Sequence, residues 1–498
     1  MKLYSENDNY KLYQGSMLDM LEVIEPETID SIVTDPPYGL TSITKRFGKE
    51  NSAECQYGKD GSFARLSRGF MGKEWDGSGI EYNIETWQKC YEVLKPGGYL
   101  LAFGGSRTFH RIACAIEDAG FEIRDTIMWL YGSGFPKSMN IGLAIDKKNG
   151  VESKIIGKAI GNINQMPDGR PSRSQIAWES KPKEYDIKEA QNKWQGWGTA
   201  LKPSFEPIIV ARKPFKGSLV DNVIEYGVGG INIDECRVEP TGEDIGRNNI
   251  NAKNSPLNSK DGWNNNSMVG LDTTGRYEGR FPANTILTYD ETDFDEVCGG
   301  FPNTTISKGG NNGVLNNNIY GKYNTQKNNG GTGYGDSGSA SRYFYCAKAS
   351  KKDRDEGLDE FDDKYMAFSN QAKAELKRGN VEFKGNEDNP MNFVNSVSVR
   401  KNTHPTVKPT DLMQYLVRLV SPNGATILDP FNGSGSTGKA VMYENKERNK
   451  NYKYIGIELT EEYLPIAKAR IEYVCNLIEE EKTKDKQLTI FDIGESNE

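Results

Sequence analysis

The chain has 498 residues, which is enough for two or three domains with a buried core. Its formal charge of -8 weighs against a protein whose only role is to coat nucleic acid. No stretch is long and apolar enough to span a membrane, and the N-terminus lacks an apolar signal core, so we expect a cytoplasmic protein. Seven scattered cysteines and two histidines indicate neither a metal site nor a disulfide framework.

Strand-like and helix-like segments alternate in the first part of the chain. A β-branched run at 28–35 predicts a strand, 81–98 predicts an amphipathic helix closed by Pro-Gly-Gly, and 99–105 predicts another strand. A helix over 108–119 and a strand over 121–131 continue the pattern. This alternation predicts a parallel sheet with helices on both faces.

The middle of the chain has a different composition. Residues 240–340 are rich in Asn and Gly, which form little core and indicate loops or flexible arms. Just before this stretch, residues 137–216 hold 15 Lys and Arg against 8 Asp and Glu, a local charge of +7. The charges are therefore segregated, as suits an enzyme that meets nucleic acid on one side.

The α/β pattern returns near the C-terminus, so we expect one Rossmann-like, doubly wound domain that a large irregular insertion splits. In order we expect a helix with Thr410 as its N-cap and Pro422 just past its end, a strand at 425–429, a helix from Ser436, a strand at 453–459 and a helix over 460–481. The expected domains are 1–215 and 401–480 for the two halves, 216–400 for the insertion and 481–498 for a flexible tail.

The tetrapeptide Asp35-Pro36-Pro37-Tyr38 follows the first of these strands directly. In an open α/β sheet, loops at the carboxyl ends of the strands form the ligand crevice. An exocyclic amine of adenine or cytosine is a poor nucleophile, and the Asp35 carboxylate and Pro36 carbonyl are candidates to accept its two N–H groups. The prolines fix φ, and Tyr38 offers an aromatic face to an extruded base. The alternative is a simple strand-ending turn.

A glycine-rich loop, Asp429-Pro430-Phe431-Asn432-Gly433-Ser434-Gly435-Ser436-Thr437, connects a predicted strand to a helix, and Glu458 ends the next strand. Glycines allow close backbone approach to a nucleotide, and a carboxylate after the next strand takes ribose hydroxyls. Gly438 also completes the G-x-G-x-x-G spacing of dinucleotide-binding proteins. This loop alone therefore leaves a nucleotide-dependent oxidoreductase open.

The segment Thr403-His404-Pro405-Thr406-Val407-Lys408-Pro409 precedes a predicted helix. Lys408 is a candidate to meet a ligand carboxylate, and the helix N-terminus offers N–H groups to an anion. The alternative is a solvent-facing turn.

The combination of these three segments resembles the amino-methyltransferase family of DNA-modifying enzymes in its β arrangement, with D-P-P-Y first, target recognition next and F-x-G-x-G last. Phrases such as LKPGGYLLAFGGSRTFHR and GWGTALKPSFEPIIVARKP are similar to methylases of phages and prophages. The resemblance covers about 8–146, 196–215 and 403–475. The family often has Gly-Asp where this chain has Gly15-Ser16.

The resemblance implies a circularly permuted class I methyltransferase fold, S-adenosylmethionine as cofactor and double-stranded DNA as substrate. A D-P-P-Y block favours adenine N6, whereas cytosine N4 enzymes more often begin this block with Ser. The implied catalytic residues are Asp35, Pro36, Pro37 and Tyr38, which hold a flipped base. The implied cofactor residues are Thr406 and Lys408 near the methionine end, Asp429, Phe431, Gly433, Gly435 and Thr437 in the loop, and Glu458 at the ribose.

Target recognition is expected in the insertion at 216–400. Basic residues in or near it are candidates for phosphate or guanine contacts, although a solvated surface charge is the alternative for each. They are Arg212, Lys213, Lys216, Arg237 and Arg280. In the tail, Gln487-Leu488-Thr489-Ile490-Phe491 looks like the peptide that bacterial replication proteins insert into a sliding clamp. The alternative is a tail that docks on its own domain.

Three functions therefore compete. An amino-methyltransferase uses every segment above, with cytosine N4 as the alternative target. An oxidoreductase leaves Asp35 to Tyr38 without a role. A non-catalytic DNA-binding protein leaves both loops unexplained. The catalytic hypothesis requires that Tyr38 and Phe431 meet across one pocket. The sequence indicates no oligomeric state, target site or companion restriction enzyme.

Overall fold

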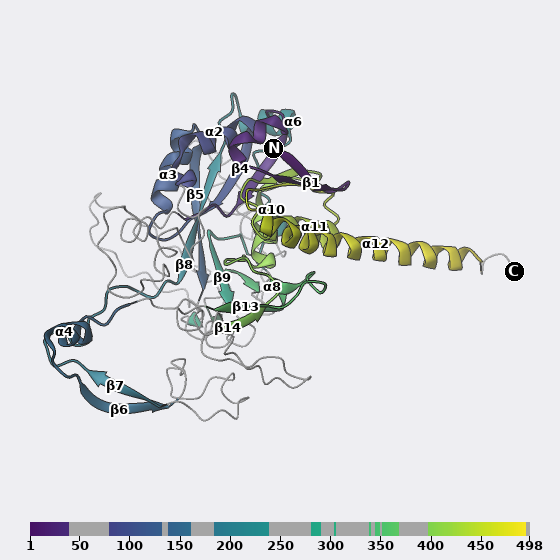
Figure 1. Ribbon diagram of the computed structural model, residues 1–498. Coiled ribbons are helices and arrows are strands. Elements are labelled where there is room, and N and C mark those ends of the chain that lie inside the picture. Colours follow the sequence, from purple (N-terminus) through teal and green to yellow (C-terminus); the bar gives the residue numbers. More distant parts are fainter. Residues whose placement is uncertain are drawn as a thin grey trace, which may run out of the picture. The chain divides into compact units, whose positions relative to one another are not determined.

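The computed structural model shown in Figure 1 forms two compact units, residues 1–131 with 205–498 and residues 132–204. The residues that it describes are 1–38, 79–131, 138–160, 184–238, 280–289, 303–304, 338–339, 344–348, 351–367 and 397–494.

A ten-stranded sheet forms the centre of the larger unit, in the order β1-β2-β16-β15-β3-β4-β8-β5-β9-β12. Its strands from β2 to β4 are parallel, and β8 runs antiparallel between β4 and β5. The predicted α/β sheet is thus confirmed. The strands are β1 (Lys2–Glu6), β2 (Tyr10–Gln14), β3 (Ile29–Thr34), β4 (Leu94–Phe103), β5 (Glu122–Tyr131), β8 (Phe205–Arg212), β9 (Thr285–Tyr289), β12 (Tyr345–Lys348), β15 (Thr426–Asp429) and β16 (Lys453–Glu458).

Apolar cores cover both faces of this sheet. In β4, Leu101 and Phe103 join one core, whereas Leu100 and Ala102 join the other, because successive side chains point to opposite faces. One face is covered by α2 (Ile84–Val93) and α3 (Phe109–Asp118), and the other by α10 (Thr410–Val420), α11 (Ser436–Arg448) and α12 (Leu464–Gly494) (Figure 1). The doubly wound arrangement is confirmed, and burial on both faces explains why the strand reads YLLAF without alternation.

The strand order reverses between β15 and β3. From β15 the chain passes through α11 to β16 on one side, and from β3 it passes through α2 to β4 on the other. Ligands of open α/β sheets bind outside the carboxyl ends of the strands at such a reversal. Asp35 directly follows β3 and begins the first predicted site loop. Pro430 directly follows β15 and lies within the second.

Two helix boundaries differ from the prediction. The helix expected over 81–98 ends at Val93, because Pro96 cannot continue a helix and disfavours helical backbone just before it. The last helix continues to Gly494 instead of giving way to a flexible tail at 481, since residues 466–493 contain neither Pro nor Gly. The segment 487–491 is therefore helical rather than extended. Clamp binding stays a prediction, which deletion of residues 485–498 tests.

The predicted insertion contributes to the sheet. Strands β9 and β12 come from within 216–400 and extend the sheet beyond β5. The assignment of target recognition to this segment stays a prediction. The remaining elements of the larger unit are η1 (Met17–Glu22), η5 (Ile80–Tyr82), α6 (Leu219–Tyr226), η6 (Asp234–Cys236), β10 (Asn303–Thr304), β11 (Gly338–Ser339), α8 (Lys351–Asp355), β13 (Lys364–Ala367), β14 (Val397–Arg400) and η11 (Glu461–Tyr463).

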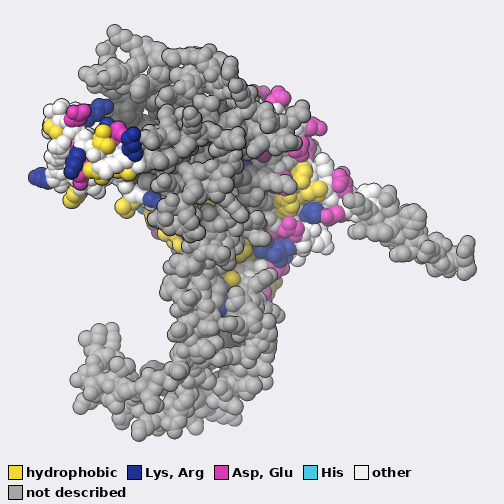
Figure 2. All heavy atoms as spheres, turned by 90° about the horizontal axis from the view of Figure 1, so that it is seen from below, with side chains coloured by type: hydrophobic (Ala, Val, Ile, Leu, Met, Phe, Trp, Pro, Cys, Tyr) yellow, Lys and Arg dark blue, Asp and Glu magenta, His cyan; other side chains and the backbone are white. Residues whose placement is uncertain are grey.

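The smaller unit contains α4 (Ile141–Asn149) and the antiparallel pair β6 (Lys154–Ile160) and β7 (Glu184–Glu189). A buried carboxylate organises it, since Asp146 accepts hydrogen bonds from the Gln191 amide at 2.8 Å and from Asn192 Nδ2 at 2.6 Å. Figure 2 shows basic, acidic and apolar side chains mixed on the described surface at its left, the side on which α4 lies in Figure 1. The exposed apolar side chains of this unit include Ile155, Ile156, Ile187 and Trp197.

Candidate active site

The two predicted site loops adjoin each other at the strand reversal. Thr34, the last residue of β3, donates a hydrogen bond from Oγ1 to Asp429 Oδ1 at 2.6 Å. Thr437 Oγ1 donates to the other oxygen of Asp429, also at 2.6 Å. Both interactions are buried. Residues separated by about four hundred positions thus fix the start of one loop against the start of the other.

Tyr38 and Phe431 belong to the same compact unit, but their rings pack against different faces of the sheet. Phe431 lies with its ring centroid 6.4 Å from that of Trp87, on the side of α2. Tyr38 packs against the core on the side of α10. The described contact between the two loops is therefore made by Thr34 and Asp429 rather than by the two aromatic rings, and a pocket shared by Tyr38 and Phe431 stays a prediction.

The glycine loop takes a backbone shape that other residues would not tolerate. Gly433 and Gly435 have φ of +52° and +75°. A Cβ atom at Gly435 would lie 2.9 Å from Ala467 Cα, so the loop sits directly against α12. Glu458 Oε2 accepts a hydrogen bond from the Gly433 amide at 2.7 Å. The carboxylate predicted for a ribose therefore also holds the loop in place.

Asp429 and Thr437 are internal braces of the glycine loop. Both are almost fully buried, and Asp429 also accepts a hydrogen bond from the Phe431 amide at 3.1 Å. Burial raises the pKa of Asp429 to about 6, although its three donors oppose that shift. The contact of these two side chains with a cofactor stays a prediction.

Among the described residues, only one of the two carboxylate oxygens of Asp35 has a hydrogen-bond partner. Its Oδ2 accepts a hydrogen bond from Lys408 Nζ at 2.6 Å. Its Oδ1 is shielded from solvent and has no hydrogen-bond partner among the described residues. Burial raises the pKa of the Asp35 carboxyl, and the Lys408 charge opposes this shift. A buried acceptor without a donor is costly, so Oδ1 is able to accept a hydrogen bond from a ligand N–H group.

Tyr38 is held at both its backbone and its hydroxyl. Its carbonyl accepts hydrogen bonds from Thr108 Oγ1 at 2.7 Å and from the Tyr82 hydroxyl at 3.0 Å. Its own hydroxyl donates to Glu206 Oε2 at 2.7 Å. Burial, reinforced by Asp35 and Glu206, raises the pKa of Tyr38 well above 10. The phenol therefore stays protonated, and its ring orientation is fixed.

Lys408 lies with Asp35 rather than with the glycine loop. Its Nζ is also 3.0 Å from the Tyr38 hydroxyl and 3.4 Å from Glu206 Oε2. The ammonium sits 4.9 Å from the ring centroid of Phe103. Burial favours the neutral amine, but Asp35 and Glu206 outweigh it and raise the pKa of Lys408. The predicted place of Lys408 near the methionine end of a cofactor stays a prediction.

Glu206 belongs to this centre and was missed by the sequence analysis. It lies at the start of β8, where Phe103 at the end of β4 pairs with Ile208. Because β8 is antiparallel to β4, its first residues lie at the carboxyl end of the parallel strands. The sequence shows an acidic residue near the start of an apolar strand, which could have suggested a functional role. Only the direction of that strand in the sheet shows that Glu206 lies at the site.

The segment from Thr403 to Pro409 forms one wall of the glycine loop. A Cβ atom at Gly433 would lie 2.9 Å from His404 Nε2, and the His404 ring also packs edge-on against Tyr463 at 4.5 Å. Burial lowers the pKa of His404 to about 3, so this imidazole is neutral at physiological pH. Thr406 is exposed, and its carbonyl contacts His404 Nδ1.

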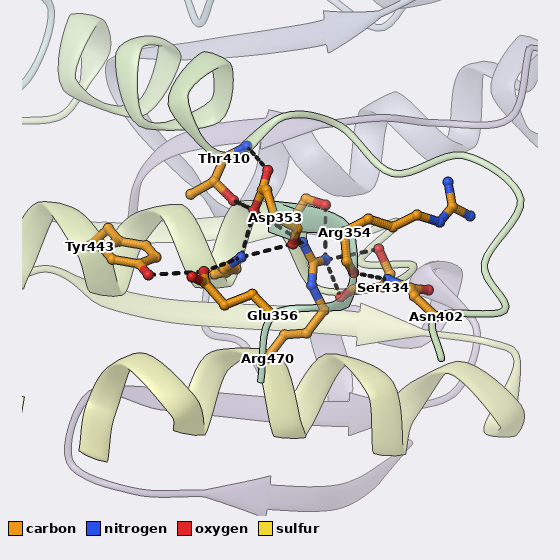
Figure 3. Close-up of polar contacts among 10 residues, drawn as sticks. Asp353, Arg354, Glu356, Asn402, Thr410, Ser434, Tyr443 and Arg470 are labelled. Carbon is orange, nitrogen blue, oxygen red and sulfur yellow. Dashed lines mark hydrogen bonds and ion pairs between the residues drawn. The ribbon is translucent and has the colours of Figure 1, made fainter. Parts of the chain in front are cut away.

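A buried ionic network lies beside the glycine loop (Figure 3). Asp353 of α8 accepts hydrogen bonds from Lys439 Nζ at 2.5 Å and from the Thr410 amide at 2.8 Å. Asp353, rather than a Thr410 N-cap, therefore serves the N-terminus of α10. Arg470 of α12 lies 3.9 Å from Asp353 and donates to the Ser434 carbonyl at 2.8 Å. The network thus connects a residue of the predicted insertion to the glycine loop.

Two basic residues predicted to contact DNA lie at the opposite edge of the sheet from the two site loops. Arg212 and Lys213 follow the other end of β8, at the amino edge of the parallel strands, because Arg212 pairs with Tyr99 at the start of the β4 ladder. Both are nearly buried and form ion pairs within the protein, Arg212 with Glu122 at 2.8 Å and Lys213 with Glu27 at 3.1 Å. Their charges are engaged in ion pairs within the protein, which does not favour contact with DNA, and such a contact stays a prediction.

The other basic candidates are in the described part of the chain. Lys216 is exposed, Arg237 pairs with Asp234 at 3.0 Å, and the backbone of Arg280 bridges Val238. Among the described residues, no cluster of three or more His, Cys, Asp and Glu side chains is placed to hold a metal ion. Likewise, none of the helices described has the length and hydropathy of a membrane span.

Comparisons with known proteins agree with this geometry. The family model described as DNA methylase matches residues 29–469. The chain is 23% identical over 240 residues to the type II methyltransferase M.HindIII of Haemophilus influenzae, a match that covers 44% of this chain and 64% of that protein. It is 27% identical over 129 residues to the DNA adenine methyltransferase YhdJ of Escherichia coli K12, covering 24% of this chain and 42% of that protein.

A crystal structure of M1.HpyAVI is 12% identical, covers 93% of this chain and 98% of that one, and superposes with a TM-score of 0.32. That score is too low to bear on the fold, which rests on the sheet order and the two cores. The chain spans less than two thirds of the length of the two curated relatives. The family match nevertheless extends over most of the 498 residues and includes both site loops. The chain therefore belongs to the DNA methylase family of amino-methyltransferases.

Proposed function

We propose that the protein transfers a methyl group from S-adenosylmethionine to N6 of adenine in double-stranded DNA. The observation that carries this proposal is the buried Oδ1 of Asp35, which has no hydrogen-bond partner among the described residues and lies beside the fixed ring of Tyr38. A flipped adenine that stacks on Tyr38 would bring its amine to this oxygen. The second N–H group of the amine would then meet the Pro36 carbonyl.

The chemistry follows from the arrangement of acceptors. The adenine amine is weakly nucleophilic because its lone pair is shared with the ring. Two acceptors that take both N–H groups favour a pyramidal nitrogen with an available lone pair, and they stabilise the positive charge that develops during attack. Pro36 and Pro37 are buried and restrict φ, so the acceptors are positioned before the base arrives.

The residues of the glycine loop fit a nucleoside cofactor. The loop places backbone N–H groups and the carboxylate of Glu458 at the end of β15, where the backbone approaches α12 too closely for any side chain at Gly435. When bound, S-adenosylmethionine supplies a methyl group on a sulfonium. In this proposal Gly433, Gly435 and Phe431 line its pocket, Glu458 binds the ribose, and Asp429 and Thr437 hold the loop.

Adenine is proposed over cytosine because the block begins with Asp35. A carboxylate is a stronger acceptor than a hydroxyl, and here it is kept in the centre by Lys408. YhdJ, a relative with 27% identity, is a DNA adenine methyltransferase by name. Target recognition is assigned to 216–400, with Lys216, Arg237 and Arg280 as candidate DNA contacts, and a cytoplasmic location is part of the proposal.

The direct test is incubation with methyl-labelled cofactor and genomic DNA, followed by mass analysis of the nucleosides. We expect N6-methyladenine. Finding N4-methylcytosine would overturn the choice of base, and finding no modified base would overturn the function.

Asp35→Ala separates catalysis from DNA binding. We expect methyl transfer to fall by about 1,000-fold or more while DNA binding persists. Asp118→Ala removes an exposed carboxylate of α3 and serves as the matched control with unchanged activity. Normal methyl transfer by Asp35→Ala would remove the catalytic role of the D-P-P-Y block.

A further inference from the structure

Among the described residues, the centre around Asp35 contains more carboxylates than ammonium groups. Lys408 Nζ lies 2.6 Å from Asp35 Oδ2 and 3.4 Å from Glu206 Oε2, and all three side chains are at most 21% exposed. One ammonium group therefore balances two carboxylates. These three side chains together carry a surplus negative charge, and Glu206 is the residue that provides it.

This surplus matters because the reaction generates positive charge. Attack by the amine forms a nitrogen–carbon bond while the carbon–sulfur bond breaks with its electrons going to sulfur, so the nitrogen becomes positive. The Asp35 carboxylate faces that nitrogen, but Lys408 compensates its charge at 2.6 Å. Without Glu206, the group nearest the developing cation would belong to a neutral pair, which stabilises a cation poorly.

We propose that Glu206 supplies the negative charge that stabilises the methylated amine and is the final acceptor of its proton, acting through Lys408. The inference rests on the proposed function and adds a positioning residue to it.

The proton route balances in two transfers. The methylated amine loses one N–H proton to Asp35 Oδ1, the oxygen that is shielded from solvent. A half-turn of the carboxyl group brings that proton to Lys408, which gives one of its own protons to Glu206 and receives the proton of Asp35. Asp35 and Lys408 return to their starting charges, and Glu206 becomes neutral. Its side chain is 20% exposed, which allows release to water.

Among the described residues, the groups that face Glu206 leave it as the final acceptor in this route. Tyr38, from the loop after β3, donates its hydroxyl to Glu206 at 2.7 Å, and Tyr131 of β5 lies at 3.5 Å. Burial raises the pKa of Tyr131 to about 12 and that of Tyr38 well above 10, so both phenols stay protonated. Lys408 and Asp35 are the charged neighbours. No described contact places a second cation against Glu206.

The test is Glu206→Gln, which keeps the shape and an acceptor for Tyr38 but removes the charge. We expect single-turnover methyl transfer to fall by about 100-fold, with the Kd for cofactor and DNA within about threefold of wild type. The charge of Glu206 raises the pKa of Asp35, so its loss should also move the acid limb of the rate to lower pH. A residue that only shapes Tyr38 would not shift this limb.

Glu122→Gln is the matched control, because Glu122 is a carboxylate that pairs with the opposite end of β8. It should leave the rate and the acid limb unchanged. Glu206→Ala with added acetate is the second arm: acetate, but not chloride at equal ionic strength, should restore part of the rate. Rescue by acetate would support the proposal even if Glu206→Gln proved unstable, and failure of rescue in a folded variant would count against it.

The proposal is overturned if Glu206→Gln keeps the wild-type single-turnover rate and acid limb, or if its loss of rate comes entirely from weaker cofactor or DNA binding. Either result can occur while the wild type methylates adenine and Asp35→Ala is inactive, so the proposed function would survive it. A wild type that transfers no methyl group would instead remove the proposed function itself.

Discussion

The loops after β15 and after β3 are built in different ways. Within the glycine loop, the bracing side chains are close in sequence, since Asp429, Thr437 and Glu458 all lie within 30 positions of one another, and Thr34 adds one distant hydrogen bond. The D-P-P-Y loop is held by Thr108, Glu206 and Lys408, which are 70, 168 and 370 residues from Tyr38. A nucleotide loop can thus be specified locally, whereas the catalytic centre depends on the assembly of the whole sheet.

Among these substitutions, Lys408→Met should disrupt the catalytic centre around Asp35 most severely. It leaves two neighbouring carboxylates without a cation, so we expect a loss of methyl transfer of about 100-fold or more and of about 3 kcal/mol in the free energy of unfolding. Single-turnover kinetics and urea unfolding measure the two effects.

Lys213→Met provides the control, because Lys213 is a similarly buried lysine paired with Glu27 at the other end of β8. It should lose stability but not activity. If Lys408→Met weakened cofactor binding and left the rate at saturating cofactor intact, Lys408 would serve the cofactor rather than Asp35.

Gly435→Ala should break the locally built loop. The alanine would have to adopt a φ of +75°, and its Cβ would lie 2.9 Å from Ala467 Cα. We therefore expect the loop to shift and the Kd for cofactor to rise about tenfold or more. Equilibrium binding of the cofactor measures this. Gly150→Ala meets a similar φ of +69° with nothing within 4 Å, and should leave cofactor binding unchanged. Equal affinity in Gly435→Ala would show that the close approach to α12 has no role.

Asp353→Asn sharpens the comparison by testing how far the glycine loop depends on a residue outside it in the sequence. Arg470 and Lys439 would lose their buried counter-charge, so we expect a loss of about 2–3 kcal/mol in stability and about fivefold in cofactor affinity, transmitted through Ser434. Thermal unfolding and cofactor binding together measure it. Glu356→Gln removes the other carboxylate on Lys439 and should affect stability more than affinity. Equal affinity losses in the two variants would contradict transmission through Arg470.

The smallest effect at neutral pH concerns His404, because burial lowers the pKa of its imidazole. Its pKa is about 3 in the folded protein and near 6.5 when unfolded, so only the unfolded state binds a proton between these values. Its contribution to stability is therefore complete above pH 6.5 and is lost as the pH falls, by at most about 1.4 kcal/mol per pH unit. His404→Gln should flatten the pH dependence of the free energy of unfolding below 6.5. A wild-type slope in the variant would refute the neutral, buried imidazole.

The fold and the backbone of both loops followed from short-range patterns. Apolar runs, helix boundaries and the two loop motifs predicted the parallel sheet, because these features depend on neighbouring residues. Glu206 and Asp353 could not be found in this way, since nothing near them in sequence shows where they point. Arg212 and Lys213 show the converse: their composition suggested DNA contacts, but the direction of β8 carries them to the opposite edge of the sheet. Long-range partners are set by topology.

Asp353 has a consequence for engineering. Exchange of recognition segments between relatives is an obvious route to new target sequences, and the natural boundaries of the segment here would be about 216 and 400. Such an exchange would remove α8 and leave Lys439 and Arg470, both fully buried, without their carboxylate. A chimera should therefore place its downstream junction before residue 351, so that the recipient protein keeps its own Asp353.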